Sequence, residues 1–327
     1  MSNPTWRYAD TFEYMDHTRA GFPPAMICVA CNGGIQGKET HSGLPETPDE
    51  IADSVQAAYE AGASMVHVHA RDSRDFTQGA RRIDEWLEVN SRIRERCPDI
   101  VINNTTGGDL TMSMEERLSC LDAGPDVASL NLTPDMSRFT MKARLPPLPH
   151  PRPETEVDAC IPFTYGLVEQ FAAEMKQRGI KPEMETYHTG GAWVMRDLID
   201  RKLVEPPYLI QTVMGAQTAS YPTPEHVIML LRELPEQTVW LCSGIGPFQL
   251  PLTTLALLMG GHARVGLEDN LYYSRGRRFQ DNAEAVKRVV RIAGELNRRI
   301  ATPAETRALL GLPAAGVAAN KAKRTTS

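Results

Sequence analysis

Two histidines separated by one residue, His67 and His69, are the part of this sequence best suited to chemistry. Val66 and Val68 precede and separate them, which is typical of a β-strand. Alternate side chains of a strand share a face, so both imidazoles are predicted to point the same way and to bind one metal ion. Imidazole suits zinc and neighbouring transition metals, and such a site needs at least one further protein ligand.

Two adjacent carboxylates, Glu268 and Asp269, are the candidates for that further ligand and for acid–base work. Neighbouring residues face different ways, so one acid is expected to bind the metal and the other to move a proton. Two histidines and one carboxylate leave a zinc position open, as in catalytic sites. Arg264, four residues before Glu268, is expected to hold a substrate carboxylate or to pair with an acid. Capping of the next helix is the alternative role for both acids.

The elements that must position these side chains are short apolar strands that alternate with helices. Strands are expected at residues 25–30, 64–69, 100–103, 127–130, 181–187, 208–213, 238–242 and 263–267. Helices are expected at residues 47–61, 83–96, 114–121, 165–178, 192–201, 251–259 and 278–298, with one more starting at Thr223. Eight strand–helix units in series predict an α/β fold, a (β/α)8 TIM barrel. An open doubly wound sheet is the alternative, but no GxGxxG motif follows the first strand.

The chain is expected to hold one catalytic domain over residues 25–312, after an N-terminal extension at 1–24 and before a flexible tail at 313–327. A Pro-rich stretch at 145–153 is expected to be a surface loop or arm. The net charge of −6 argues against a nucleic-acid surface. The basic cluster at 275–278 is read as a solvated helix start, with a contact to an anionic ligand as the alternative. No stretch approaches the roughly 18 apolar residues of a membrane span, and no signal region is visible, so a cytoplasmic location is expected.

In such a barrel the chemistry gathers at the carboxyl ends of the strands. The last strand closes against the first, which lies beside the second, so Glu268 is expected to reach His67 and His69. Other polar strand ends include residues 103–108 and Ser129. The glycines at 107 and 108 form either a plain turn or a backbone cradle for an anion.

These residues resemble the β-keto acid cleavage enzyme family. The resemblance is carried by residues 67–72 (HVHARD), 105–108 (TTGG) and 260–270 (GGHARVGLEDN), with support from 44–52 and 243–246. It extends from about residue 25 to residue 312, and the segment at 260–270 is its most specific part.

The resemblance implies a tetrameric TIM barrel with one zinc ion per chain and acetyl-CoA as co-substrate. The implied reaction converts a β-keto acid and acetyl-CoA to acetoacetate and the CoA ester of the shortened acid, by enolate formation and retro-Claisen cleavage. The implied zinc ligands are His67, His69 and Glu268. Asp269 and Arg264 correspond to the pair for proton abstraction and substrate binding. The implied substrate-binding positions are Thr105, Gly108 and Ser129, and the hydroxyl of Thr106 is expected to assist them.

One position departs from the family's best-known member, which has a glutamate after its first strand that pairs with the amino group of its substrate. The corresponding residue here is Ile35, which cannot pair with an ammonium group. We therefore expect a β-keto acid without an amino substituent, and an apolar or acyl chain in particular.

A metal-dependent hydrolase of the amidohydrolase type is the rival interpretation, because such barrels also use a His-x-His pair. They need further histidines, and although His188 is available, residues 208–213 contain none. A non-enzymatic barrel is disfavoured, because a buried polar metal cluster is costly without a use.

Overall fold

A closed barrel of eight parallel strands forms the centre of the computed structural model, which describes residues 8, 10–108 and 111–316. In spatial order the strands are β1 (Ile27–Ala30), β12 (His262–Val265), β11 (Thr238–Gly244), β10 (Tyr208–Met214), β9 (Lys181–Thr186), β6 (Val127–Asn131), β5 (Val101–Asn104) and β2 (Met65–Val68). The prediction of a TIM barrel is confirmed, and the open sheet is excluded because β1 pairs with both β2 and β12.

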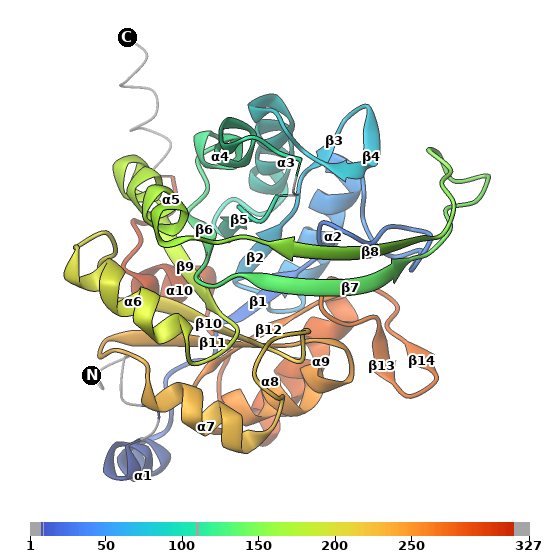
Figure 1. Ribbon diagram of the computed structural model, residues 1–327. Coiled ribbons are helices and arrows are strands. Elements are labelled where there is room, and N and C mark those ends of the chain that lie inside the picture. The colour runs from blue at the N-terminus through green and yellow to red at the C-terminus, as the bar shows by residue number, and fades with distance from the viewer. Residues whose placement is uncertain (1–7, 9, 109–110, 317–327) are drawn as a thin grey trace.

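Helices surround the barrel and connect its strands (Figure 1). They are α2 (Pro48–Glu60), α3 (Ile83–Arg96), α4 (Met114–Asp122), α5 (Tyr165–Arg178), α6 (Gly191–Asp200), α7 (Pro224–Arg232), α8 (Gln249–Leu258) and α9 (Asn282–Glu295), with a 3-10 turn η1 (Gly246–Phe248) before α8. The expected capping box at the start of α2 is present: the Thr47 hydroxyl accepts from the backbone N–H of Glu50, and the Glu50 carboxylate accepts from that of Thr47.

The two halves of the barrel interior differ in polarity. The amino-terminal half is filled by an apolar cluster that includes Met26, Met65, Val101 and Leu209, and Leu310 from α10 (Pro303–Leu310) packs against it. The polar strand-end residues lie in the other half. The fold therefore separates a packed base from a polar mouth, as parallel barrels do.

Three hairpins that were not predicted from the sequence lie on the mouth side of the barrel. They are β3 (Arg71–Asp72) with β4 (Asp75–Gly79), β7 (Asp135–Met141) with β8 (Thr155–Ile161), and β13 (Tyr272–Ser274) with β14 (Arg277–Arg278). The last of these corrects the expected helix start at residue 278. Gly276 adopts the left-handed φ of 79° that closes the β13–β14 turn, and Asp281 caps α9 at Asn282 instead.

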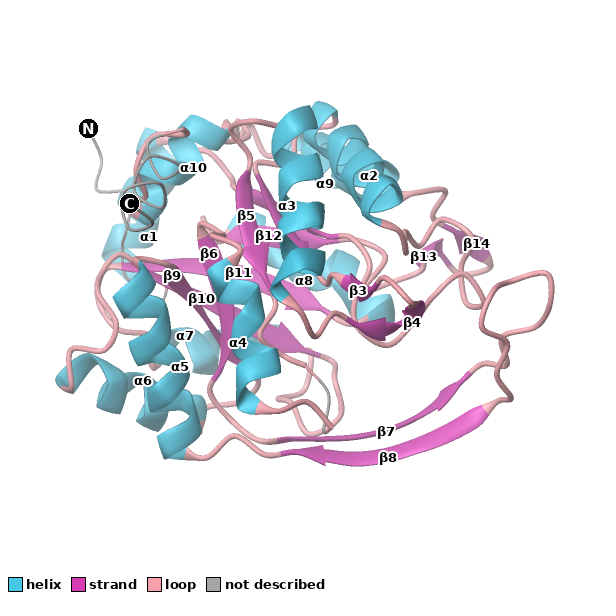
Figure 2. Ribbon diagram, turned by 90° about the horizontal axis from the view of Figure 1, so that it is seen from above, coloured by secondary structure: helices cyan, strands magenta, loops and turns pink. Residues whose placement is uncertain are grey.

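The β7–β8 hairpin is the longest of the three and extends along one side of the molecule, away from the helical layer (Figure 2). The Pro-rich stretch at 145–153 lies between its two strands, as the predicted loop or arm. A buried ion pair anchors this end: Arg144 is fully buried and donates to Glu46 at 2.8 and 2.9 Å and to Glu39 at 2.6 Å. These two acids belong to the segment between β1 and α2, so the anchor ties the hairpin to the barrel.

The N-terminal extension packs on the barrel through Tyr8, which is buried and whose hydroxyl accepts from the Trp240 N–H of β11 at 3.2 Å. The predicted extension at 1–24 contains α1 (Thr11–Ala20), which has no buried residue. Of the predicted tail at 313–327, residues 317–327 lie outside the described part of the chain. No helix in the described ranges has the length and apolar character needed to span a bilayer.

Candidate active site

The three predicted metal ligands lie together at the mouth of the barrel. The Nε2 atoms of His67 and His69 are 3.2 Å apart, and the Glu268 Oε1 atom lies 3.7 and 3.4 Å from them. His67 lies on β2, and His69 is the first residue after this strand. Glu268 lies in the loop after β12. Three convergent donor atoms at these separations could hold one metal ion.

Local backbone geometry explains how Glu268 reaches the histidines. Gly266 has a φ of 143°, and a Cβ atom there would lie 2.1 Å from the carbonyl oxygen of Ala30. Only glycine allows the chain to leave β12 this close to β1. The side chain of Asn32 fixes the other part of the site, because its amide donates to the His69 carbonyl at 2.7 Å and accepts from the His69 N–H at 3.2 Å.

Arg264 joins the two acids that follow it. Its guanidinium donates to both carboxylate oxygens of Asp269 at 3.0 and 2.9 Å and to Glu268 Oε1 at 2.8 Å. Asp269 also accepts from the Ser243 hydroxyl at 3.0 Å. Glu268 faces the histidines while Asp269 faces Arg264 and Ser243, as expected for adjacent residues with different tasks. Ser243 had no predicted role.

Burial and charge set the protonation states of this cluster. Burial, reinforced by Arg264, lowers the pKa of His67 well below its ordinary value, so the imidazole is in the neutral form that binds metals. Burial opposes ionisation of Glu268, but Arg264, together with His69, outweighs it and holds the pKa of Glu268 well below its ordinary value. Burial raises the pKa of Asp269 despite Arg264, with a further contribution from Glu268. The two environments thus shift the pKa values of these adjacent acids in opposite directions. This difference suits Glu268 to bind a metal and Asp269 to act as a base.

Two further buried acids, Glu183 and Glu185 on β9, were not predicted as site residues. Glu185 lies 3.5 Å from Arg264, and Glu183 accepts a hydrogen bond of 2.6 Å from Asn103. Burial raises their pKa values to about 7 and about 8, respectively. The available signal was their spacing: two acids at alternate positions of one strand share a face, as His67 and His69 do.

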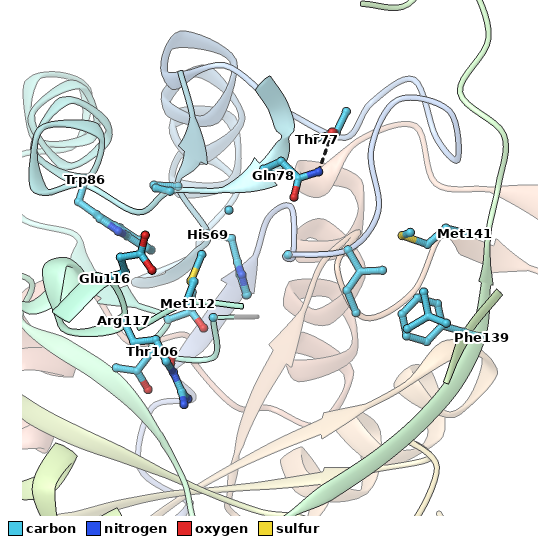
Figure 3. A pocket seen from close by; sticks show the side chains of 18 of the residues that line it. His69, Thr77, Gln78, Trp86, Thr106, Met112, Glu116, Arg117, Phe139 and Met141 are labelled. Carbon is cyan, nitrogen blue, oxygen red and sulfur yellow. Dashed lines mark hydrogen bonds between the residues drawn. The ribbon is translucent and has the colours of Figure 1, made fainter. Parts of the chain in front are cut away.

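A pocket of about 250 Å³ opens beside the cluster of His67, His69 and Glu268 (Figure 3). Four of the five predicted substrate-binding residues line it, together with His69; they are Ile35, Thr105, Thr106 and Gly108. In Figure 3, Phe139 and Met141 of β7 stand on the side opposite His69, Trp86 and Met112. The outer wall, which also includes Val157 of β8, was not predicted from the sequence because the β7–β8 hairpin was not predicted.

Ser129 is the predicted substrate-binding residue that does not line this pocket. It is buried, and its hydroxyl accepts from the Thr106 N–H at 3.1 Å while the Thr106 hydroxyl donates to its carbonyl at 2.7 Å. In the structure Ser129 therefore supports the 105–108 loop from behind.

The loop that carries Ile35 is held by a buried arginine from the HVHARD segment. Arg71 donates to the carbonyl oxygens of Gly33 at 2.5 Å, Gln36 at 2.8 Å and Gly34 at 3.3 Å. Ile35 itself remains 51% exposed and lines the pocket. Three hydrogen bonds from Arg71 thus hold the loop so that Ile35 forms part of the pocket wall.

The residues at the cluster also fit a metal chemically. Glu268 Oε2 and His67 Nδ1 are both buried without a hydrogen-bond partner, and the imidazoles of His67 and His69 direct their Nε2 atoms at each other. Buried polar atoms are normally satisfied, so the cluster has unused ligand capacity. By contrast, His188, which a hydrolase would need, accepts from the backbone N–H of Gly190 at 3.1 Å.

Comparison with known proteins agrees with this geometry. Residues 24–312 match the family model for beta-keto acid cleavage enzymes. The chain is 33% identical to a 3-keto-5-aminohexanoate cleavage enzyme of Fusobacterium nucleatum, over 88% of this chain and 97% of that one. It is 33% identical to a 3-oxoadipate:acetyl-CoA acetyltransferase of Cupriavidus necator, over 89% and 95% of the two chains.

Among solved structures, apo ObcA shares the fold, with a TM-score of 0.66 and 19% identity over 83% of this chain and 66% of ObcA. None of these comparisons supports the amidohydrolase alternative. The matches to the family model and to the two curated relatives each cover most of the chain. The chain therefore belongs to the β-keto acid cleavage enzyme family.

Proposed function

We propose that this enzyme is a zinc-dependent acyltransferase that converts a neutral β-keto acid and acetyl-CoA to acetoacetate and the CoA ester of the shortened acid. The observation that carries the proposal is the juxtaposition of the His67–His69–Glu268 cluster with the Arg264–Asp269 pair. Relatives named as acetyl-CoA transferases, including a 3,5-dioxohexanoate:acetyl-CoA acetone transferase from Paraburkholderia graminis, support the co-substrate.

The proposed metal ligands are His67, His69 and Glu268. Bound zinc supplies a Lewis acid that polarises the keto group of the substrate. Asp269 takes the proton from the carbon between the keto and carboxylate groups, since its raised pKa makes it a better base than an ordinary aspartate. Arg264 orients Asp269 through two hydrogen bonds.

The bonds then exchange in two steps. The substrate carbanion attacks the acetyl carbon, and CoA leaves as the thiolate. The thiolate attacks the original keto carbon, and the carbon–carbon bond breaks to give the new CoA ester and the carbanion of acetoacetate. This carbanion takes back the proton held by Asp269, which releases acetoacetate and restores the base. Thr105, Thr106 and Gly108 lie where they can hold the substrate carboxylate, with Ser129 supporting them from behind.

The proposed substrate carries an apolar chain. Ile35, Phe139, Met141, Val157 and Trp86 give the pocket an apolar character on several sides. Arg152 and Glu116 also line it, but the Arg152 guanidinium is paired with Glu39 at 2.9 Å and the Glu116 carboxylate with Arg81 at 3.2 Å. An ammonium group in this pocket would meet no carboxylate at position 35.

The test is a panel of β-keto acids with acetyl-CoA, in which acetoacetate formation is followed. Neutral acyl chains such as 3-oxohexanoate should outrun both 3-keto-5-aminohexanoate and the acidic 3-oxoadipate. Preference for 3-keto-5-aminohexanoate would contradict the proposed specificity. Absence of acetoacetate with every keto acid of the panel would contradict the proposed reaction.

Three further features belong to the same proposal. One zinc ion per chain is measurable by elemental analysis. A cytoplasmic location is supported by the six free cysteines, which suit a reducing compartment. The homotetramer stays a prediction, and light scattering of the purified protein checks it.

A further inference from the structure

The ring of His67 has two nitrogen atoms with different surroundings. Its Nε2 faces His69 and Glu268, whereas its Nδ1 lies 4.0 Å from Glu183 Oε2. The side chains of His67 and Glu183 are only 3% and 0% exposed, so water does not solvate either group. Both His67 Nδ1 and Glu183 Oε1 lack a hydrogen-bond partner.

The position of Glu183 is defined by its neighbours in the barrel. Asn103 is the register partner of His67 on the adjacent strand, and its amide donates to Glu183 Oε2 at 2.6 Å. A fully buried carboxylate is costly unless it is paired, and the proposed reaction assigns Glu183 no task. An acid held against the far side of a candidate metal ligand suggests a role in orienting that ligand.

We propose that Glu183 is a positioning residue that accepts a hydrogen bond from the Nδ1–H of His67 and so directs the Nε2 lone pair at the metal position. The proposal rests on the zinc site proposed above. Histidine ligands commonly donate their second ring N–H to a carboxylate, which fixes the tautomer and raises the basicity of the ligand. The present 4.0 Å gap is about 1 Å longer than a hydrogen bond, and the broad terminal torsion of glutamate allows it to close.

A second cation is the competing interpretation, because donor atoms of His67, Glu183 and Glu185 lie within 4.8 Å of one another. The amide of Asn103 argues against it. This N–H group donates directly to Glu183 and would compete with a cation for the same oxygen. Metal stoichiometry separates the two interpretations.

The experiment compares zinc affinity, by chelator competition, in the full-length wild type and in Glu183→Gln. We expect about one zinc per chain in both proteins and a 10- to 100-fold weaker affinity in the variant. The absorption spectrum of the cobalt-substituted protein should also change, because the ligand field of His67 changes. Should Glu183→Gln fail to fold, Glu183→Asp withdraws the carboxylate by one methylene and serves the same comparison.

Gln211→Met is the matched control, because Gln211 is equally buried in the barrel but donates to Glu185 rather than facing His67. Its zinc affinity should remain within about twofold of the wild type. Unchanged affinity in Glu183→Gln would overturn the proposal, and so would a second metal in the wild type that this variant loses. Because metal binding is measured without substrate, failure of the positioning role is distinguishable from failure of the proposed reaction.

Discussion

The floor and the rim of the candidate site are built in different ways. The floor consists of side chains from strand ends and the residues just after them, and they hold one another: Asp269 is 4% exposed and hydrogen-bonded to Arg264 and Ser243. The rim consists of a loop and hairpins that carry half-exposed apolar groups, such as Ile35 at 51% exposure and Phe139 on β7.

This difference teaches where chemistry and selectivity reside. Polar groups that must keep their geometry are anchored on barrel strands, because a buried network tolerates little rearrangement. The groups that meet the variable part of a substrate lie on loops, where a substitution leaves the barrel intact. Changes in the floor should therefore abolish turnover, whereas changes in the rim should redirect it.

The largest effect is expected from His67→Ala. The variant should lose most of its zinc and about 10³-fold or more in turnover, because a Lewis acid contributes several kcal/mol to such a reaction. Elemental analysis after dialysis gives the metal content. His188→Ala is the control, since His188 follows β9 at the same mouth but bonds to the Gly190 backbone, and it should keep its zinc. Full zinc occupancy in His67→Ala would refute the ligand assignment.

Asp269→Asn should be the next most damaging change. The amide keeps the shape of the side chain but cannot accept a proton, so kcat should fall by about 10²- to 10⁴-fold. Zinc content and thermal stability should stay close to those of the wild type, which separates loss of the base from loss of the site. Steady-state kinetics with the preferred keto acid gives the answer, and a wild-type rate would end the assignment of Asp269 as the base.

Ile35→Glu should redirect the enzyme. A carboxylate at the pocket wall would pair with the ammonium of 3-keto-5-aminohexanoate and would be left unpaired beside an apolar chain. The kcat/KM for 3-keto-5-aminohexanoate, divided by the kcat/KM for a neutral keto acid such as 3-oxohexanoate, should rise by about 10- to 100-fold. Ile35→Leu keeps the apolar character and should leave the ratio nearly unchanged. Equal losses with both substrates would show that Ile35 does not select them.

The smallest effect is expected from Phe139→Ala. Loss of a half-buried ring from the outer wall should raise KM for long-chain acids by about fivefold at unchanged kcat, since about 1 kcal/mol of apolar contact is removed. Thr140→Ala is the control, because Thr140 is exposed and outside the pocket lining. A change of kcat alone in Phe139→Ala would place the ring in the catalytic step instead.

The floor was largely predictable from the sequence because its signals are local. Helices α3 and α5 begin and end where expected, at 83–96 and 165–178, and the alternate spacing correctly predicted that the side chains of His67, on β2, and His69, just after it, point the same way. The resemblance of segment 260–270 to the family identified Glu268, Asp269 and Arg264 as site residues. Several other boundaries moved by one to three residues, and the turn at Gly276 moved the start of α9 from residue 278 to Asn282.

The rim and the buried acids were not predictable for physical reasons. β7 and β8 alternate between half-buried and exposed residues, and their anchor through Arg144 joins residues far apart in sequence. Glu183 and Glu185 resemble exposed strand residues until the closed barrel places them in its interior. The spacing of the two acids shows that they share a face of β9, but only the tertiary structure shows that this face is buried, and only it shows the anchor of the hairpin.

The most direct test of the whole account is the fate of a labelled acetyl group. Wild-type enzyme should be supplied with acetyl-CoA carrying ¹³C at both acetyl carbons and with the best unlabelled keto acid of the panel. Acyl transfer predicts acetoacetate labelled at carbons 3 and 4 and an unlabelled CoA ester of the shortened acid, with both products formed at least about 10²-fold more slowly by Asp269→Asn. Label recovered as free acetate, with the keto acid intact, would contradict the account.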